Sequence, residues 1–167
     1  MLEVPFVHQI DALPEDQKAN IRGTACGPAA ITMALKYLGY EIDLMGVIEK
    51  LPTTVYVKGA RFYNLYAGPE LFGKEVHRFK NSPAAIFEAL SAGNPVILNI
   101  QNYDGITGHA VVVVGMKGFD GEKADTLIIH DPFVGAYREF EYIDNWNLRQ
   151  PEGYVTPIGI LDPFYVT

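Results

Sequence analysis

The sequence contains a single cysteine, Cys26, in the stretch ACGPAAITMALKYLG (25–39). The residues after it predict a helix over 26–39, with Pro28 in its first turn and Gly39 at its end. A cysteine at this position faces free backbone N–H groups and the positive end of the helix dipole, which both favour the thiolate. A thiolate can attack a carbonyl carbon. The alternative is that Cys26 is a small buried hydrophobic residue, because cysteine is among the most buried residue types.

A thiol nucleophile needs a base, and the chain has four histidines: His8, His77, His109 and His130. His109 opens the apolar run GHAVVVVGMKG (108–118), which predicts a strand, and a rigid strand holds a side chain in a fixed position. The alternative for His109 is a single hydrogen bond at the end of that strand. We interpret the other three as surface or loop residues, and His130 has the further option of packing beside the site.

A base needs a partner that orients it, and Asp131 closes the next apolar run, TLIIHD (126–131). The intervening GFDGEKAD (118–125) has the composition of a hairpin turn. Antiparallel pairing of the two strands brings residue 109 towards residues 130–135, where Asp131 can orient the imidazole. The alternative is that Asp131 and Pro132 are only a turn signal.

Acyl transfer also needs hydrogen-bond donors for the developing oxyanion. The side-chain amide of Gln9, in VPFVHQI (4–10), and the backbone N–H of Cys26 are the candidates. Gly27 keeps the backbone beside the sulfur uncrowded for a carbonyl substrate. We therefore expect Gly27 and Gly108, which precedes the candidate base, to lie at the substrate-binding site.

The other predicted elements must position these side chains. Apolar residues on nearly every side of the 26–39 helix indicate a buried, central helix. Asp43 and Ser82 are candidate N-caps for two further helices, over 43–51 and 82–93. Strands are predicted over 95–101, 108–118, 126–131, 137–143 and 154–161.

Three segments are less regular. Residues 4–10 predict an edge strand or an extended arm, 11–24 a loop, and 52–80 mostly loop with at most short helices. The aromatic residues of 55–72 either line a cleft or pack in the core. Helices first and strands later predict one α+β domain over residues 1–167, with a mostly antiparallel sheet.

Composition limits the functions that fit. A net charge of −7 and a pI near 5 argue against nucleic acid or an anionic membrane as the main partner. No apolar run is long enough to span a bilayer. The N-terminus lacks a signal-peptide pattern, and a mature chain from which a signal peptide had been removed would look the same. One cysteine excludes an intramolecular disulfide and a Cys-rich zinc site, and it fits both the cytosol and a secreted thiol enzyme. We expect no cofactor.

The stretches VPFVHQI, ACGPAAITMALKYLG, GNPVILNI, TGHAVVVVG and IIHDP occur in an order that resembles the C39-like cysteine peptidases. The resemblance covers about residues 4–135, with a compatible strand tail to 161. It implies a papain-like fold, with the N-terminal helix packed centrally on the sheet. It also implies a thiol hydrolase acting on a peptide or protein substrate. The implied residues are Cys26 as nucleophile, His109 as base, Asp131 as orienting residue and Gln9 as oxyanion donor.

The sequence departs from related patterns in several ways. The Cys-Gly-Ser-Cys-Trp signature of larger papain-type enzymes is absent, and the gap from Gln9 to Cys26 is longer than in the leader-cleaving transporter domains. No ATP-binding or transmembrane segment follows, so we expect a free-standing protein. Two other functions stay open. One is an inactive peptide-binding module on the same fold, and the other is a metal site of Cys26, His109 and Asp131, which no compact ligand spacing supports.

Overall fold

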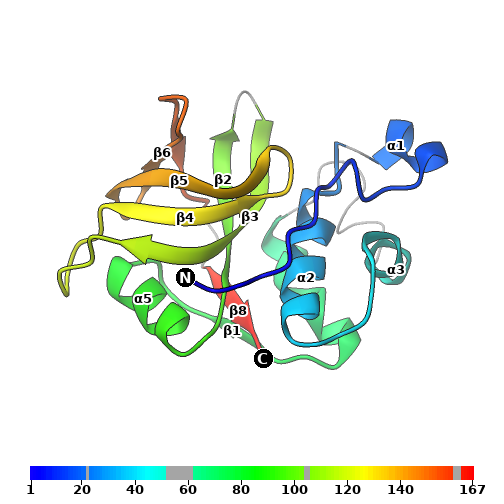
Figure 1. Cartoon of the computed structure of the whole chain (residues 1–167), viewed down its shortest axis with the longest axis horizontal. Helices are drawn as coiled ribbons and strands as arrows, with labels where there is room; N and C mark the ends of the chain where they lie inside the picture. Colours follow the sequence, from blue (N-terminus) through cyan, green and yellow to red (C-terminus); the bar gives the residue numbers. More distant parts are fainter. Residues whose placement is uncertain (22, 52–61, 104–105, 160–162) are drawn as a thin grey trace.

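The structure is a computed structural model, and it describes residues 1–21, 23–51, 62–103, 106–159 and 163–167. An extended N-terminal arm leads into the helices, and the strands follow (Figure 1). The α-helices are α1 (Glu15–Ile21), α2 (Cys26–Tyr37), α3 (Leu44–Lys50) and α5 (Pro83–Ser91), and the 3-10 helices are η1 (Phe62–Ala67) and η2 (Pro69–Phe72). The strands are β1 (Val76–Arg78), β2 (Val96–Tyr103), β3 (Ile106–Lys117), β4 (Thr126–Asp131), β5 (Gly135–Asp144), β6 (Asn147–Arg149), β7 (Val155–Pro157) and β8 (Phe164–Val166).

These strands form one sheet in the order β1-β8-β2-β3-β4-β5-β6-β7, and the neighbouring pairs are antiparallel. The segment after β7 returns to β2, where Ile158 bridges Ile100 and the N–H of Gly159 donates to the carbonyl of Asn99. Strands β2 to β7 therefore curl round towards a closed shape. The predicted α+β class with a mostly antiparallel sheet is confirmed.

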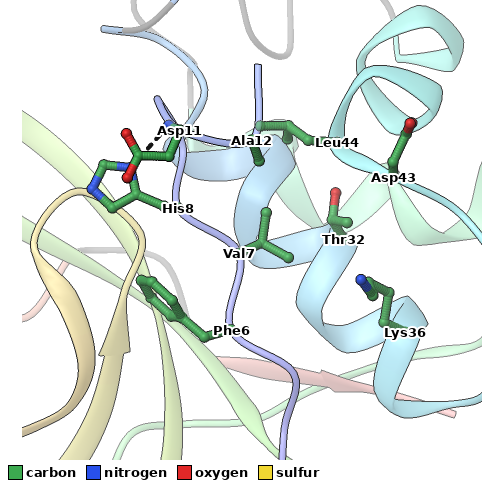
Figure 2. Close-up of a pocket in the computed structure, with 9 residues that line it drawn as sticks. All are labelled: Phe6, Val7, His8, Asp11, Ala12, Thr32, Lys36, Asp43 and Leu44. Carbon is green, nitrogen blue, oxygen red and sulfur yellow. Dashed lines mark hydrogen bonds and ion pairs between the residues drawn. The ribbon is translucent and has the colours of Figure 1, made fainter. Parts of the chain in front are cut away.

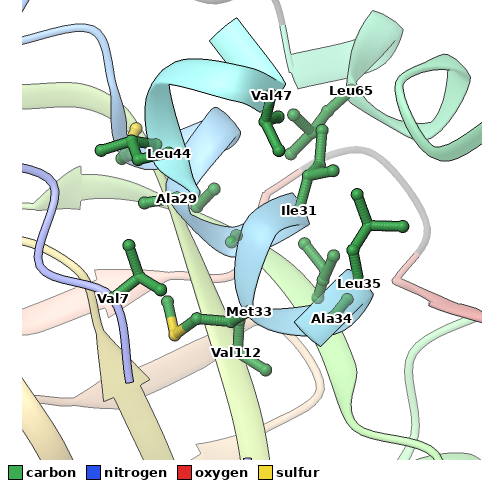
Figure 3. Packing of buried hydrophobic residues seen from close by; sticks show 14 of the residues in the cluster. Val7, Ala29, Ile31, Met33, Ala34, Leu35, Leu44, Val47, Leu65 and Val112 are labelled. Carbon is green, nitrogen blue, oxygen red and sulfur yellow. The ribbon is translucent and has the colours of Figure 1, made fainter. Parts of the chain in front are cut away.

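The sheet has two apolar faces because successive side chains of a strand point to opposite sides. On one face, residues such as Ala110, Val112 and Val114 pack against α2, α3 and the arm (Figure 3). On the other face, residues such as Val111 and Val113 point into the curl of the sheet. Helix α5 covers that inner cluster, and Figure 1 shows it across the sheet from α2 and α3.

Helix α2 lies at the centre of the fold, as predicted. Every residue from Cys26 to Leu35 is buried, which explains why its apolar residues are not confined to one face. The helix ends where Gly39 adopts a positive φ of 85° and the N–H of Tyr40 reaches the carbonyl of Leu35 at 2.9 Å.

The two predicted N-caps are also confirmed. The Asp43 side chain accepts a hydrogen bond from the N–H of Gly46 at 2.8 Å, at the start of α3. The Ser82 hydroxyl accepts one from the N–H of Ala85 at 3.1 Å, at the start of α5. Both caps satisfy backbone donors that have no partner within the helix.

The N-terminal half departs from prediction in one place. The predicted loop over 11–24 contains α1, a helix with no buried residue and therefore no apolar pattern in its sequence. Residues 4–10 form the extended arm, the second of the two predicted alternatives. Of the predicted irregular segment 52–80, residues 52–61 lie outside the described part. Residues 62–72 form the short helices η1 and η2, in which Leu65 and Phe72 are buried in the core.

Short strands account for the other differences. The three-residue strands β1, β6 and β8 were not predicted, and the predicted strand over 154–161 is limited to β7, with residues 160–162 outside the described part. β1 and β8 pair although Val76 and Val166 are far apart in sequence. In the described part of the chain, no helix is both long enough and apolar enough to cross a membrane.

Candidate active site

The N-terminal arm is fastened along β3 and β4 by backbone hydrogen bonds. The N–H of Leu2 donates to the carbonyl of Val114 at 2.8 Å, and the N–H of Gln9 donates to that of Pro132 at 2.7 Å. Gln9 is only 3 % exposed. The arm thus places Gln9 beside the turn that directly follows Asp131.

Cys26 is the first residue of α2, as predicted, and it is 6 % exposed. Ala25, which precedes it, offers no side-chain cap, so the free N–H groups of the first turn are not covered from that side. The sulfur accepts hydrogen bonds from the backbone N–H groups of Gly27 and Ala110. The start of α2 and the start of β3 therefore both provide donors for a thiolate.

His109 and Asp131 lie on the neighbouring strands β3 and β4. His109 Nε2 and Asp131 Oδ1 are 2.8 Å apart, and the two side chains are almost fully buried. A side-chain hydrogen bond also links His109 to Cys26. Because Nε2 is engaged by the carboxylate, Nδ1 is the ring nitrogen left for the sulfur. The structure thus brings together the three side chains that the sequence singled out.

The electrostatics of the site favour a thiolate beside an imidazolium. Burial alone would raise the pKa of Cys26, but the hydrogen bond and positive charge of His109 and the two backbone donors lower it below its ordinary value. Burial alone would lower the pKa of His109, yet its hydrogen bonds to Asp131 and Cys26 and their negative charges raise it to about 9. Both shifts favour the thiolate–imidazolium form of the pair over the neutral form.

Asp131 supplies a fixed negative charge to this pair. Burial alone would raise its pKa, but the hydrogen bond and charge of His109, together with the Tyr103 hydroxyl and the backbone N–H of Phe133, lower it to about 2. The N–H of Phe133 donates to Oδ1 at 2.9 Å. The carboxylate is therefore ionised at neutral pH.

Three residues at this site were not predicted. The Tyr103 hydroxyl donates to Asp131 Oδ2, and Arg138 Nη1 donates to the same oxygen at 2.8 Å. Arg138 also pairs with Glu152, which is half exposed on the β6–β7 turn. One feature of the sequence could have indicated this contact. Arg138 alternates with Phe140 and Tyr142 on β5, so all three side chains point to the inner face of the sheet. An arginine on a buried face needs a buried anion as its partner.

The two glycines proposed for substrate binding lie close to the predicted side chains. A Cβ on Gly27 would meet Leu65 Cδ1 at 2.8 Å, so a larger residue here would have to displace the end of the Leu65 side chain. Gly108 is half-buried and pairs with Gln101 of β2, one residue before His109. Their role towards a substrate stays a prediction.

His130 is completely buried, so the interpretation as a surface or loop residue is wrong for it. Its Nδ1 accepts from the N–H of Tyr137 at 3.1 Å, and its Nε2 donates to the carbonyl of Val4 at 2.9 Å. It thereby fastens the arm to β4. Burial lowers the pKa of His130, which keeps the neutral ring that these two bonds require.

The remaining two histidines bond to other parts of the chain. His8 Nδ1 accepts from the backbone N–H groups of Ile10 and Asp11 in a turn of the arm. His77 lies on β1, where its Nε2 is 2.8 Å from the hydroxyl of Thr167.

A half-open pocket of about 450 Å³ lies between the arm and helices α2 and α3 (Figure 2). Its walls include Phe6 and His8 from the arm and Thr32 and Lys36 from α2. Cys26, His109 and Asp131 do not line it, so this pocket is separate from the candidate catalytic side chains.

A metal centre is the alternative for the same three side chains. Among the residues described, no group of three or more His, Cys, Asp or Glu side chains is arranged to hold a metal ion. His109 and Asp131 instead bond to each other. The expectation of no metal or cofactor stays a prediction.

Comparisons with known proteins show the family and the fold of this chain. The model of a family described as the Peptidase_C39 like family matches residues 1–153, which confirms the resemblance seen in the sequence. The solved peptidase domain of Streptococcus ComA, a bifunctional ABC transporter involved in a quorum-sensing pathway, superposes with a TM-score of 0.65 and 18 % identity. The match covers 99 % of this chain and 98 % of that one, and it shows the same papain-like fold. A search of curated proteins gives no match.

Proposed function

The chain belongs to the Peptidase_C39 like family, and we propose that it is a thiol hydrolase that cleaves a peptide or related amide bond. The family and the fold are those of a cysteine peptidase. The proposal goes further by assigning the reaction to Cys26, His109 and Asp131, with Gln9 as an oxyanion donor.

The observation that carries the proposal is the continuous chain of hydrogen bonds from sulfur to carboxylate. Cys26 bonds to His109, and His109 bonds to Asp131 at 2.8 Å. The three side chains come from α2, β3 and β4, so each is held by a regular element. Such a chain gives a nucleophile, a proton carrier and an orienting group in the order that thiol hydrolysis requires.

The first half of the reaction forms an acyl-enzyme. The Cys26 thiolate attacks the amide carbon, a carbon–sulfur bond forms, and the carbonyl electron pair moves to oxygen. When this tetrahedral intermediate collapses, the carbon–nitrogen bond breaks and the leaving amine takes a proton from the His109 imidazolium. The products of this half are a free amine and a thioester on Cys26.

Water completes the cycle. Neutral His109 takes a proton from a water molecule while the water oxygen attacks the thioester carbon. The carbon–sulfur bond then breaks. This step releases a carboxylic acid and restores the thiolate–imidazolium pair. Asp131 keeps its negative charge throughout and stabilises the imidazolium in each half.

Two donors are available for the oxyanion. The N–H of Cys26 lies at the uncapped start of α2, where the helix dipole also favours negative charge. Gln9 is held near the site by its backbone bond to Pro132. Its side-chain amide is the proposed second donor.

The test uses a complex mixture of peptides of varied sequence, incubated with the wild-type protein and with a Cys26→Ala variant. Mass spectrometry then records new peptide ends. We expect new ends with the wild type alone. Retention of peptides on both proteins, with no new ends from either, would contradict the proposal and support the inactive peptide-binding module.

A further inference from the structure

Tyr103, the last residue of β2, contacts the candidate base and its orienting carboxylate at once. Its ring stacks on the imidazole of His109, with 4.3 Å between ring centroids and 25° between planes. Its hydroxyl donates to Asp131 Oδ2, while His109 Nε2 engages Oδ1. The two rings therefore lie face to face, and each of them bonds to a different oxygen of the Asp131 carboxylate.

Arg138 fixes the direction of the tyrosine hydrogen bond. Its Nη1 donates to the Tyr103 oxygen at 3.3 Å and to Asp131 Oδ2 at 2.8 Å. Because the guanidinium can only donate, the single hydroxyl proton of Tyr103 is directed to the carboxylate. Oδ2 then holds two donors, which leaves Oδ1 to His109 and to the N–H of Phe133.

This arrangement restrains the imidazole in two ways. The stacked ring covers one face of His109, and Tyr103 itself is only 2 % exposed, so it keeps water from that side of the His109–Asp131 bond. Because the carboxylate is fixed, its hydrogen bond to Nε2 fixes the orientation of the imidazole ring. The orientation of the ring in turn determines where Nδ1 points.

We propose that Tyr103 is a positioning residue that holds the His109 ring with Nδ1 towards the Cys26 sulfur. The inference rests on the proposed function, because it assigns Tyr103 to the same thiolate–imidazolium pair. It differs from a packing role, in which Tyr103 would only fill space in the inner apolar cluster.

The test measures ionisation of the thiol, which needs no substrate. Absorbance at 240 nm is followed against pH for the wild type, Tyr103→Phe and Tyr103→Leu, with the spectrum of a Cys26→Ala protein subtracted. Tyr103→Phe keeps the stacked ring and removes the hydroxyl, and Tyr103→Leu removes both. Thermal unfolding of each variant is recorded in parallel.

Tyr142→Phe is the matched control. Tyr142 is also buried on the inner face of the sheet, and its hydroxyl donates to Asn145 Oδ1 at 2.9 Å and accepts from Asn81 Nδ2 at 3.2 Å. The control therefore removes a bonded tyrosine hydroxyl from the same cluster, away from His109.

We expect the pKa of the thiol to rise by about one unit or more in Tyr103→Leu and by about 0.3 units or more in Tyr103→Phe, because a loosely held imidazolium stabilises the thiolate less. One unit means about tenfold less thiolate below the pKa. Tyr142→Phe should titrate like the wild type.

Folded Tyr103 variants that titrate like the wild type, whatever their thermal stability, would overturn the inference. If Tyr103→Leu does not fold, Tyr103→Phe decides the question by the same criterion. The two proposals fail separately. Peptide cleavage with unshifted Tyr103 titrations would refute only the role of Tyr103, and shifted titrations without any cleavage would refute only the proposed reaction.

Discussion

The imidazole of His109 and the carboxylate of Asp131 meet at 2.8 Å across the strand pair β3–β4. The register explains how: Val112 pairs with His130, so the end of β4 and the turn after it lie beside the start of β3. In the thiolate–imidazolium form, charges of alternating sign follow one another from the sulfur to the surface, on Cys26, His109, Asp131, Arg138 and Glu152. Each buried charge has a partner of opposite sign, which offsets the cost of burying it.

Replacing Asp131 by Asn tests whether this carboxylate orients His109, because the Cys26 thiol itself stays in place. We expect cleavage of a peptide substrate, once one is found, to fall by about a hundredfold or more in kcat/KM, because the imidazolium loses its stabilising charge. Unfolding in urea should also show a loss of about 3 kcal/mol, since Arg138 is left without its buried carboxylate. Asp144→Asn, at the exposed end of β5, is the control. Equal kcat/KM in Asp131→Asn and the control would argue against the orienting role.

Replacing Gln9 by Ala tests the proposed oxyanion donor. Loss of one such donor typically lowers kcat by about a hundredfold to a thousandfold. Gln17→Ala, in helix α1, is the control. A kcat in Gln9→Ala within about twofold of that control would remove Gln9 from the mechanism.

The pH dependence of the free energy of unfolding should report the hydrogen bonds by which His130 holds the N-terminal arm on β4. Burial lowers the pKa of His130 in the folded state, so the unfolded chain binds the proton more readily. The stabilisation is therefore fully present above about pH 6.5 and is lost as pH falls towards the lowered pKa.

Urea unfolding of the wild type and of His130→Gln, at several pH values between 5 and 7.5, measures this effect. We expect the free energy of unfolding of the wild type to fall more steeply below pH 6.5 than that of the variant. Parallel slopes would show that His130 does not titrate as the structure requires.

Gly27→Ala distinguishes packing from substrate access. The added methyl group displaces Leu65, and overpacking typically costs about 1–3 kcal/mol, which is partly offset by the gain of about 0.5–1 kcal/mol for alanine in a helix. We expect a small loss of stability that Leu65→Val restores, with thiol titration unchanged because the Gly27 N–H remains. A raised KM with unchanged stability, and no rescue by Leu65→Val, would instead place Gly27 against the substrate.

The sequence allowed the three candidate catalytic side chains to be predicted because each lies at the end of a strongly apolar element. The apolar composition of α2, β3 and β4 marks those ends clearly, and a hairpin turn joins the two strands. Tyr103 and Arg138 could not be paired with Asp131 in advance, because their meeting depends on how the sheet curls. Helix α1 was missed because it buries no residue, and β1 and β8 because each is three residues long and pairs across most of the chain.

We infer that Cys26 rests as a thiolate paired with His109. The most direct test is absorbance at 240 nm against pH for the wild type and His109→Gln, each with the spectrum of the corresponding Cys26→Ala protein subtracted. Because Cys26 is the only cysteine, the difference reports this thiol alone. We expect the wild-type thiol to ionise below the ordinary cysteine pKa, and the thiol of His109→Gln to have a pKa at least about one unit higher than the wild type. A wild-type thiol that ionises only near the ordinary cysteine pKa, and equally in the variant, would contradict it.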